Sequence, residues 1–220
     1  MKIMVISPHP DDETLGCGAT LLKHKNKKDK IFWLNVTSAG PKSGYSYKFA
    51  KKREIEIQKV CNAYKFNGYS NLQFPTKFLD QIPKSNLIES FNLYINKIKP
   101  EKIFIPSESD IHTDHKIVFS ICHNYTKSFR YPFIKQILAY ETISETNFNF
   151  SKKNTFCPNV FEDITNFFNK KLKIMKIYKS ELKKHPFPRS LDSLKSLAIL
   201  RGSQSGFKYA EAFELIKEIK

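Results

Sequence analysis

Short apolar runs alternate with longer amphipathic segments through the first two-thirds of the chain, and this alternation restricts the fold more than any other feature. The runs predicted to form buried strands are residues 2–7, 31–37, 72–74, 102–106 and 134–140. The segments predicted to form helices between them are residues 13–25, 47–66, 86–98 and 115–125. Strands that alternate with helices build a mostly parallel sheet with helices on both faces. The sequence therefore predicts an α/β protein.

The last third of the chain shows a different pattern. Residues 148–158 are polar and irregular, and a helical periodicity returns over residues 164–182. Two further helices are predicted at residues 191–200 and 209–219, with glycines between them. We find no internal repeat and no low-complexity linker, and a length of 220 residues suits one domain. We therefore expect a single domain over residues 1–220, with a helical C-terminal extension on the sheet.

Basic residues outnumber acidic ones by 37 to 21, which gives a formal net charge of +16. Nucleic-acid recognition favours arginine, whose planar fork fits phosphates and base edges. Only four of the 37 basic residues are arginines, and the lysines are scattered in short clusters. We find no helix-turn-helix pattern, aromatic RNA motif or basic amphipathic arm. The charge indicates either a solvated basic surface or a field that steers an anionic substrate, and a nucleic-acid-binding protein is a distant alternative.

The sequence shows no segment that would place the chain in or across a membrane. No apolar run approaches the roughly 18 residues that a membrane span requires. The apolar stretch at the N-terminus is too short for a secretory signal, and no small-residue cleavage site follows it. We therefore expect a cytoplasmic protein without a membrane span.

A cluster of polar residues, Pro8-His9-Pro10-Asp11-Asp12-Glu13, directly follows the first predicted strand. Ligands of open α/β sheets bind outside the carboxyl ends of the strands, so this position suits a functional site. One histidine and two aspartates can supply nitrogen and oxygen ligands to a metal, or a carboxylate base, and the prolines fix where the side chains point. The alternative is a plain helix N-terminus, where the helix dipole favours acidic residues.

A second cluster, Asp110-Ile111-His112-Thr113-Asp114-His115, follows the predicted strand at residues 102–106. Taken alone, it can also be explained as a capped helix start with two exposed histidines. Both clusters, however, follow strands at the same edge of the predicted sheet, so they can meet there. Two histidines and one aspartate complete a three-ligand zinc set that leaves one position open for water.

The two clusters together carry a family resemblance. PHPDDE near the N-terminus, followed about a hundred residues later by HTDH, resembles the PIG-L/LmbE-like family of zinc-dependent de-N-acetylases, whose motifs are A/P-H-P-D-D-E and H-x-D-H. The likeness continues over essentially the whole chain, in Arg53-x-x-Glu56, YETISETNF, FPRSLDSL and LAILRGSQSGFKYAEAF. These segments resemble the subgroup of polysaccharide and nucleotide-sugar pathways. The resemblance implies a Rossmann-like, mostly parallel sheet.

The resemblance also implies the metal ligands. His9, Asp12 and His115 match the residues that hold zinc in this family. The native metal is inferred from the ligand types alone, and Fe(II) can occupy similar sites. Neighbouring Asp11 and Asp12 cannot easily bind one metal from a stiff turn, so Asp11 remains free.

Three further positions match catalytic residues of the family. Asp11 matches the general base that activates the attacking water. His112 matches the residue that stabilises the oxyanion or protonates the departing amine, and the sequence does not decide between these roles. Asp114 matches a partner that orients one of the metal-binding histidines.

Substrate contacts are expected from three of the four arginines. Arg53 is a candidate for substrate contact, or else a solvated helical residue that pairs with a glutamate one turn away. Arg189 and Arg201 can meet a diphosphate, since arginine forks fit phosphate oxygens, or they can cap and pack helices. Gly16-x-Gly18 is a weak phosphate-loop signal, and close packing of a helix on the sheet explains it better.

The resulting functional hypothesis is a zinc-dependent hydrolase that removes the acetyl group from an N-acetylated amino sugar, carried on a nucleotide diphosphate or a lipid diphosphate. An alternative keeps the chemistry and changes the substrate to a small N-acetylglucosaminide of thiol-cofactor biosynthesis. Neither hypothesis includes a nucleic-acid partner. The sequence leaves open whether the chain forms a homo-oligomer.

Overall fold

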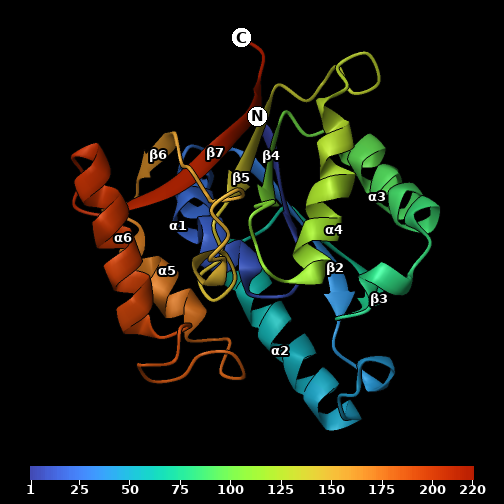
Figure 1. The fold of residues 1–220 in the computed structure, drawn as a ribbon, viewed down its shortest axis with the longest axis horizontal. Coiled ribbons are helices and arrows are strands. Elements are labelled where there is room, and N and C mark those ends of the chain that lie inside the picture. The colour runs from blue at the N-terminus through green and yellow to red at the C-terminus, as the bar shows by residue number, and fades with distance from the viewer.

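The computed structural model describes residues 1–220, in which seven strands form one sheet and six helices pack around it (Figure 1). The strands are β1 (Lys2–Ser7), β2 (Lys30–Ser38), β3 (Gly68–Pro75), β4 (Lys102–Pro106), β5 (Gln136–Tyr140), β6 (Val160–Asp163) and β7 (Ala210–Glu218). The helices are α1 (Asp12–Asn26), α2 (Tyr47–Tyr64), α3 (Lys84–Ile98), α4 (Thr113–Cys122), α5 (Phe168–Met175) and α6 (Leu191–Ser205). None of these helices has the length and apolar character needed to cross a membrane.

The sheet has the strand order β3-β2-β1-β4-β5-β7-β6. The four pairings from β3 to β5 are parallel, whereas β7 runs antiparallel to both β5 and β6. The predicted α/β fold with a mostly parallel sheet is therefore confirmed. The five strands and four helices predicted in the first two-thirds of the chain are all present.

The helix predicted at residues 209–219 is wrong, because this segment forms β7. The prediction also lacks β6. Alanine, glutamate, leucine and lysine favour helices, so the composition of AEAFELIKE indicates a helix when the segment is considered alone. In the folded chain the edge of β5 needs a pairing partner, and β7 satisfies its backbone groups while β6 satisfies those of β7. The C-terminal extension is therefore helical only in α5 and α6, and the rest of it widens the sheet.

Each face of the sheet carries its own apolar core, because successive residues of a strand point to opposite faces. Ile3 and Val5 of β1 belong to the core that is covered by α1, α2, α5 and α6. Met4 and Ile6 belong to the core that is covered by α3 and α4. Figure 1 shows α5 and α6 on one side of the sheet and α3 and α4 on the other. Burial on both faces explains the nearly continuous apolar sequences of the central strands.

The strand order reverses at β1, which lies between β2 and β4. The chain leaves β1 through α1 on one face of the sheet and enters β4 from α3 on the other. A reversal of this kind opens a crevice at the carboxyl ends of the strands. The loops that follow β1 and β4 both begin at this edge, which brings the two polar clusters of the sequence together.

Candidate active site

The loop between β1 and α1 is held in a strained conformation at Asp11. The φ angle of Asp11 is 129°, a value that residues with a side chain rarely adopt. The backbone N–H of Asp11 donates to Glu13 Oε2 over 3.0 Å, and the guanidinium of Arg53 donates to the carbonyl of Pro10. These contacts fix a turn in which Asp12 reaches the neighbouring histidines, whereas no protein group donates a hydrogen bond to the Asp11 carboxylate.

His9, Asp12 and His115 direct one ligand atom each toward a common point, and these atoms lie within 4.8 Å of one another. Asp12 Oδ2 lies 3.5 Å from His9 Nδ1 and 3.3 Å from His115 Nε2. The two imidazole nitrogens are 3.2 Å apart. Asp12 and His115 are buried and His9 is partly buried. Two imidazoles and one carboxylate form the donor set of a zinc site with an open fourth position.

The outer nitrogen of each imidazole is held by a second carboxylate. His115 Nδ1 lies 2.7 Å from Asp110 Oδ2, and His9 Nε2 lies 3.0 Å from Asp114 Oδ2. Each of these bonds keeps a proton on the outer nitrogen, so the inner nitrogen presents a lone pair to a metal. The donor set therefore fits a divalent metal such as zinc.

A second group of potential ligands, His9, His112 and Asp114, fits a metal less well. Nδ1 of His112 already accepts the backbone N–H of Asp114 over 3.1 Å. The Asp114 carboxylate accepts the backbone N–H of Lys77 over 2.7 Å and that of Leu79 over 3.2 Å. These lone pairs are occupied, so the geometry makes Asp114 a support for His9.

Charge interactions within the cluster are strong. Burial disfavours the ionised form of Asp12, but attraction to His115 and His9 outweighs burial and lowers the pKa of Asp12. Burial also opposes a charge on His115, yet Asp12 and Asp110 raise the pKa of its imidazole well above the ordinary value. The carboxylates thus hold protons on the imidazoles when no cation is bound. A divalent cation has to displace these protons, so its affinity falls as the pH falls.

Asp11 has the electrostatic environment of a proton acceptor. Burial, followed by repulsion from Asp12, raises the pKa of the Asp11 carboxyl well above its ordinary value, although Arg53 opposes the shift. A carboxyl with a raised pKa can take up a proton near neutral pH and return it.

His112 differs from the other two histidines because it presents a neutral donor. Its Nδ1 accepts the backbone N–H of Asp114, so the neutral ring carries its proton on Nε2. Burial, together with repulsion from His9 and His115, lowers the pKa of His112 to about 4. The ring of His112 meets that of His9 edge-on, with centroids 4.6 Å apart. The imidazole of His112 therefore offers an N–H group beside the three-residue donor set.

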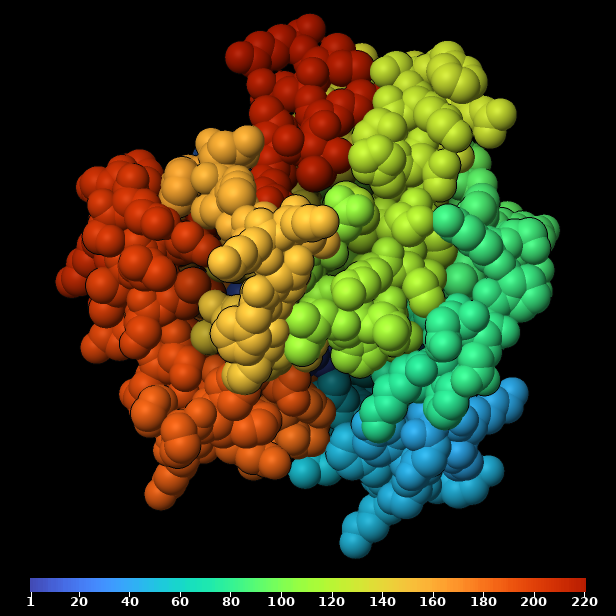
Figure 2. Space-filling model, viewed as in Figure 1, coloured from blue at the N-terminus to red at the C-terminus, as the bar shows by residue number.

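These side chains line a pocket of about 280 Å³. The loop after β1, the start of α2, the start of α4 and the segment before α6 contribute its walls. In Figure 2 the surface is hollowed where the light-green, blue and orange segments meet, and dark blue from the first residues of the chain shows at the bottom.

The structure brings two of the three predicted substrate arginines to this pocket. Arg53 Nη1 lies 3.3 Å from Glu181 Oε1, and Arg189 Nη2 donates to Glu181 Oε2 over 3.1 Å. Arg53, Arg189 and Glu181 all line the pocket. Arg201 does not line it, because its guanidinium forms a double hydrogen bond with Glu141 over 2.7 and 2.6 Å. The alternative of a packing arginine therefore describes Arg201.

Sequence reasoning assigned no role to three residues that support the site. Asp110 and Glu13 belong to the two motifs, so their position next to predicted ligands was an available signal. Glu181 joins two arginines across the pocket wall, and no motif marks it. Gly16 serves close packing, as the sequence favoured, because a Cβ there would lie 2.1 Å from the ring of Tyr140.

A comparison with known protein families finds a match that includes both motifs. The family model described as GlcNAc-PI de-N-acetylase (PIG-L) matches residues 4–126, more than half of the chain, and spans both polar clusters. A diacetylchitobiose deacetylase of Thermococcus kodakarensis is 23% identical over 241 residues, which cover 99% of this chain and 84% of the relative.

Solved structures share the fold at low sequence identity. The N,N'-diacetylchitobiose deacetylase of Pyrococcus horikoshii has a TM-score of 0.78 and 19% identity, covering 98% of this chain and 83% of its own. The 4-carboxy-2-hydroxymuconate hydratase of Pseudomonas putida has a TM-score of 0.77 and 14% identity, covering 100% of this chain and 97% of its own. The fold therefore also occurs in an enzyme named for a different reaction, and the match to the family model carries the assignment. This chain belongs to the PIG-L family of de-N-acetylases and is an enzyme of the amidohydrolase class.

Proposed function

We propose that this protein is a zinc-dependent hydrolase that removes the acetyl group from an N-acetylated amino sugar. The observation that carries the proposal is the arrangement of His9, Asp12 and His115, with both outer imidazole nitrogens held by carboxylates. Asp11 lies beside this set as a buried carboxyl that binds no other group. This combination suits the attack of water on an amide.

Each step of the proposed reaction is assigned to a particular residue of the chain. A divalent cation in the donor set, when bound, supplies a Lewis acid for the amide carbonyl and makes a nearby water more acidic. Asp11 takes a proton from the water whose oxygen attacks the acetyl carbon. Nε2–H of His112 donates to the carbonyl oxygen as it gains negative charge. The C–N bond then breaks, and Asp11 returns its proton to the amine nitrogen, so acetate and a free amine leave.

We propose the first of the two roles that the motif leaves open for His112, which is stabilisation of the oxyanion. A neutral imidazole with its proton on Nε2 can donate a hydrogen bond to an oxyanion, and it has no second proton to give to the amine. Protonation of the leaving group is therefore assigned to Asp11. Asp110 and Asp114 keep the two ligand histidines in the correct tautomer.

The finer identity of the enzyme is part of the proposal. We assign zinc as the native metal, with Fe(II) as the competing ion, and a single catalytic domain over residues 1–220 that acts in the cytoplasm. The sugar is carried on a nucleotide diphosphate or a lipid diphosphate. Arg53 and Arg189 line the pocket as candidate substrate contacts, and each pairs with Glu181 in the structure. Turnover compared on nucleotide sugars and on small N-acetylglucosaminides of thiol-cofactor type separates this substrate class from the alternative.

The test is acetate release from N-acetylated sugars by the zinc-loaded protein, compared with an Asp11→Asn variant. We expect the variant to lose activity by a factor of about 10³, within the range of general acid–base catalysis, while zinc content stays at one per chain. Asp80→Asn, an exposed aspartate in a surface turn, is the matched control and should keep full activity. Full activity of the Asp11→Asn variant, or of protein treated with a chelator, would overturn the mechanism.

A further inference from the structure

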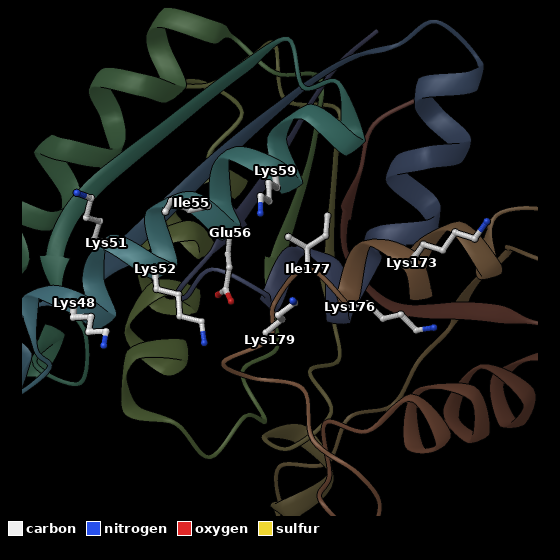
Figure 3. A pocket seen from close by; sticks show the side chains of 10 residues that line it. All are labelled: Lys48, Lys51, Lys52, Ile55, Glu56, Lys59, Lys173, Lys176, Ile177 and Lys179. Carbon is white, nitrogen blue, oxygen red and sulfur yellow. The ribbon is translucent and has the colours of Figure 1, made fainter.

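A groove lined mostly by lysines lies between α2 and the segment that follows α5 (Figure 3). Its volume is about 500 Å³, and seven of its ten lining residues are lysines. Four of the seven belong to α2, and three belong to residues 173–179, in and after α5. Figure 3 shows Glu56, Lys59 and Lys179 directed into the space between α2 and the segment after α5, with Ile177 facing them.

The positive charge of this groove is not neutralised within the chain. All seven lysines are exposed, and none forms an ion pair or side-chain hydrogen bond. Glu56 is the only carboxylate of the lining, and it lies 3.5 Å from the guanidinium of Arg53. One groove thus holds seven of the 33 lysines of the chain, whose mutual repulsion a bound anion would relieve.

The groove and the catalytic pocket share a thin wall. Arg53 lines the pocket, and Glu56, one helical turn further along α2, lines the groove. The hydroxyl of Ser180 joins them, accepting from Arg53 Nη1 over 3.0 Å and donating to Glu56 Oε2 over 2.9 Å. On the other side Glu181 lines the pocket and Lys179 lines the groove. The two spaces are therefore direct neighbours, separated only by this wall.

The lining of the groove favours a phosphate ester over a membrane or a nucleic acid. A bilayer presents a flat surface, whereas this surface is concave. No arginine or aromatic side chain lines the groove, so it lacks the stacking platforms of single-strand nucleic-acid sites. Lysine ammonium groups bind phosphates as mobile point charges.

A second observation indicates a hydroxyl group beside the phosphates. Oε1 of Glu56 is buried and has no hydrogen-bond partner, although the residue lines the groove. A buried carboxylate oxygen without a donor is costly, and a ligand hydroxyl that donates to it removes that cost. Sugars and nucleosides both carry such a hydroxyl next to a diphosphate.

We propose that this groove binds the diphosphate of the substrate while the N-acetylated sugar occupies the catalytic pocket. The proposal rests on the function proposed above and adds the residues that recognise the carrier. Nucleoside diphosphates and lipid diphosphates both contain the diphosphate that the lysines would bind. The groove therefore recognises the diphosphate itself and does not distinguish the two carriers.

The kinetic test uses the zinc-loaded double variant Lys52→Gln/Lys179→Gln and three substrates. These are a nucleoside diphosphate N-acetylglucosamine, a short polyprenyl diphosphate N-acetylglucosamine and uncharged N,N'-diacetylchitobiose. We expect kcat/KM to fall about tenfold or more on at least one diphosphate and to stay within about twofold on the uncharged sugar. The exposed pair Lys97→Gln/Lys195→Gln removes the same charge elsewhere and should change neither value. An equal loss on all three substrates, or no loss on either diphosphate, would overturn the proposal, and the responding diphosphate identifies the carrier.

A measurement without turnover separates the groove from the catalytic mechanism. Reductive methylation of the Asp11→Asn variant, read residue by residue by mass spectrometry, should show that each responding diphosphate sugar protects Lys52 and Lys179 but leaves Lys97 and Lys195 reactive. If the wild-type protein deacetylates no sugar while this protection is seen, the proposed function fails and the diphosphate site stands. Protection by phosphatidylglycerol vesicles without protection by either diphosphate would assign the groove to a membrane surface and contradict the proposal.

Discussion

Asp11 shows how this site separates two adjacent carboxylates. A non-glycine residue at a φ of 129° costs on the order of 1–3 kcal/mol, so the surrounding structure must hold it there. Glu13 binds the backbone N–H of Asp11, and Arg53 binds the carbonyl of Pro10. Arg53 therefore holds the loop between β1 and α1 in place, in addition to lining the pocket.

The Nε2–H group of His112 leads to a prediction about catalytic efficiency. Because its neutral ring donates through Nε2, His112→Ala should lower kcat/KM on the uncharged sugar by a factor of roughly 10²–10³. His112→Gln, whose amide can place an N–H group in the same region, should lose less. Zinc content and KM should change little in either variant.

The pH dependence of His112→Gln provides the counter-test. The pKa of His112 is lowered to about 4, so the ring stays neutral as the pH falls from 8 to 5 and gains a proton only below that range. The acid limb of the kcat/KM profile should therefore lie at the same pH in the wild-type protein and the variant. A basic limb that is present in the wild-type protein and absent from the variant would show that a charged His112 acts as the acid.

The first helix is interrupted, and two distant elements complete it. Cys17 has non-helical backbone angles, which leaves backbone groups on either side of the kink without partners. Lys171 of α5 donates to the carbonyl of Leu15, and the Glu211 carboxylate of β7 accepts from the N–H groups of Ala19 and Thr20. The strand that sequence reasoning mistook for a helix therefore supports the helix that carries Asp12.

The ammonium of Lys171 lies 2.7 Å from the Glu211 carboxylate, and we expect this buried ion pair to stabilise the contacts of α5 and β7 with α1. Lys171→Met leaves a buried carboxylate without its cation and should lower the free energy of unfolding by about 3–5 kcal/mol in urea. Glu211→Gln should lose a similar amount, and the double variant should lose less than the sum of the two. Lys170→Met, an exposed neighbour on the same helix, is the control. Strictly additive losses in the double variant would show that the pair is not coupled.

At the scale of the whole molecule, the lysines that produce the net charge of +16 fall into two groups. Most lysines are dispersed over the surface, as the scattered sequence clusters indicated. Seven of them, from two segments more than a hundred residues apart, line one groove beside the pocket. Our proposal assigns the electrostatic field, which was one interpretation of the charge, to this groove.

Metal binding should stabilise the whole fold, because the donor set joins the loop after β1 to α4. A ligand present at about 1,000 times its Kd stabilises the native state by about 4 kcal/mol. For a chain of this length, that corresponds to a rise in Tm of about 8–16 °C when zinc is added to the metal-free protein. Calorimetry should show the rise in the wild-type protein and in His123→Ala, and should show almost none in His115→Ala. Equal shifts in all three proteins would place the metal elsewhere.

The parts of the fold that could be predicted are those that local sequence determines. Buried central strands such as KIMVIS are short apolar runs that end at polar turns, as expected of strands buried on both faces. Asp11, Asp12 and the histidines of the two motifs lie directly after such strands. The strand β7 could not be predicted, because its residues favour a helix and only the open edge of β5 makes them a strand. The sequence left two alternatives for Arg201 for a related reason, since its partner Glu141 lies 60 residues away.

By itself the sequence determined the α/β class, the membership in a de-N-acetylase family and the residue types at the candidate active site, because periodicity and short motifs are local properties. The tertiary structure alone decided which carboxylate supports which histidine, which tautomer His112 adopts and which lysines share a groove. Asp114 meets His9 across 105 positions of sequence, and Glu211 meets Ala19 across 192. Contacts of this range depend on how the sheet is ordered and on which backbone groups remain unpaired, and neither is recorded in any short stretch of the chain.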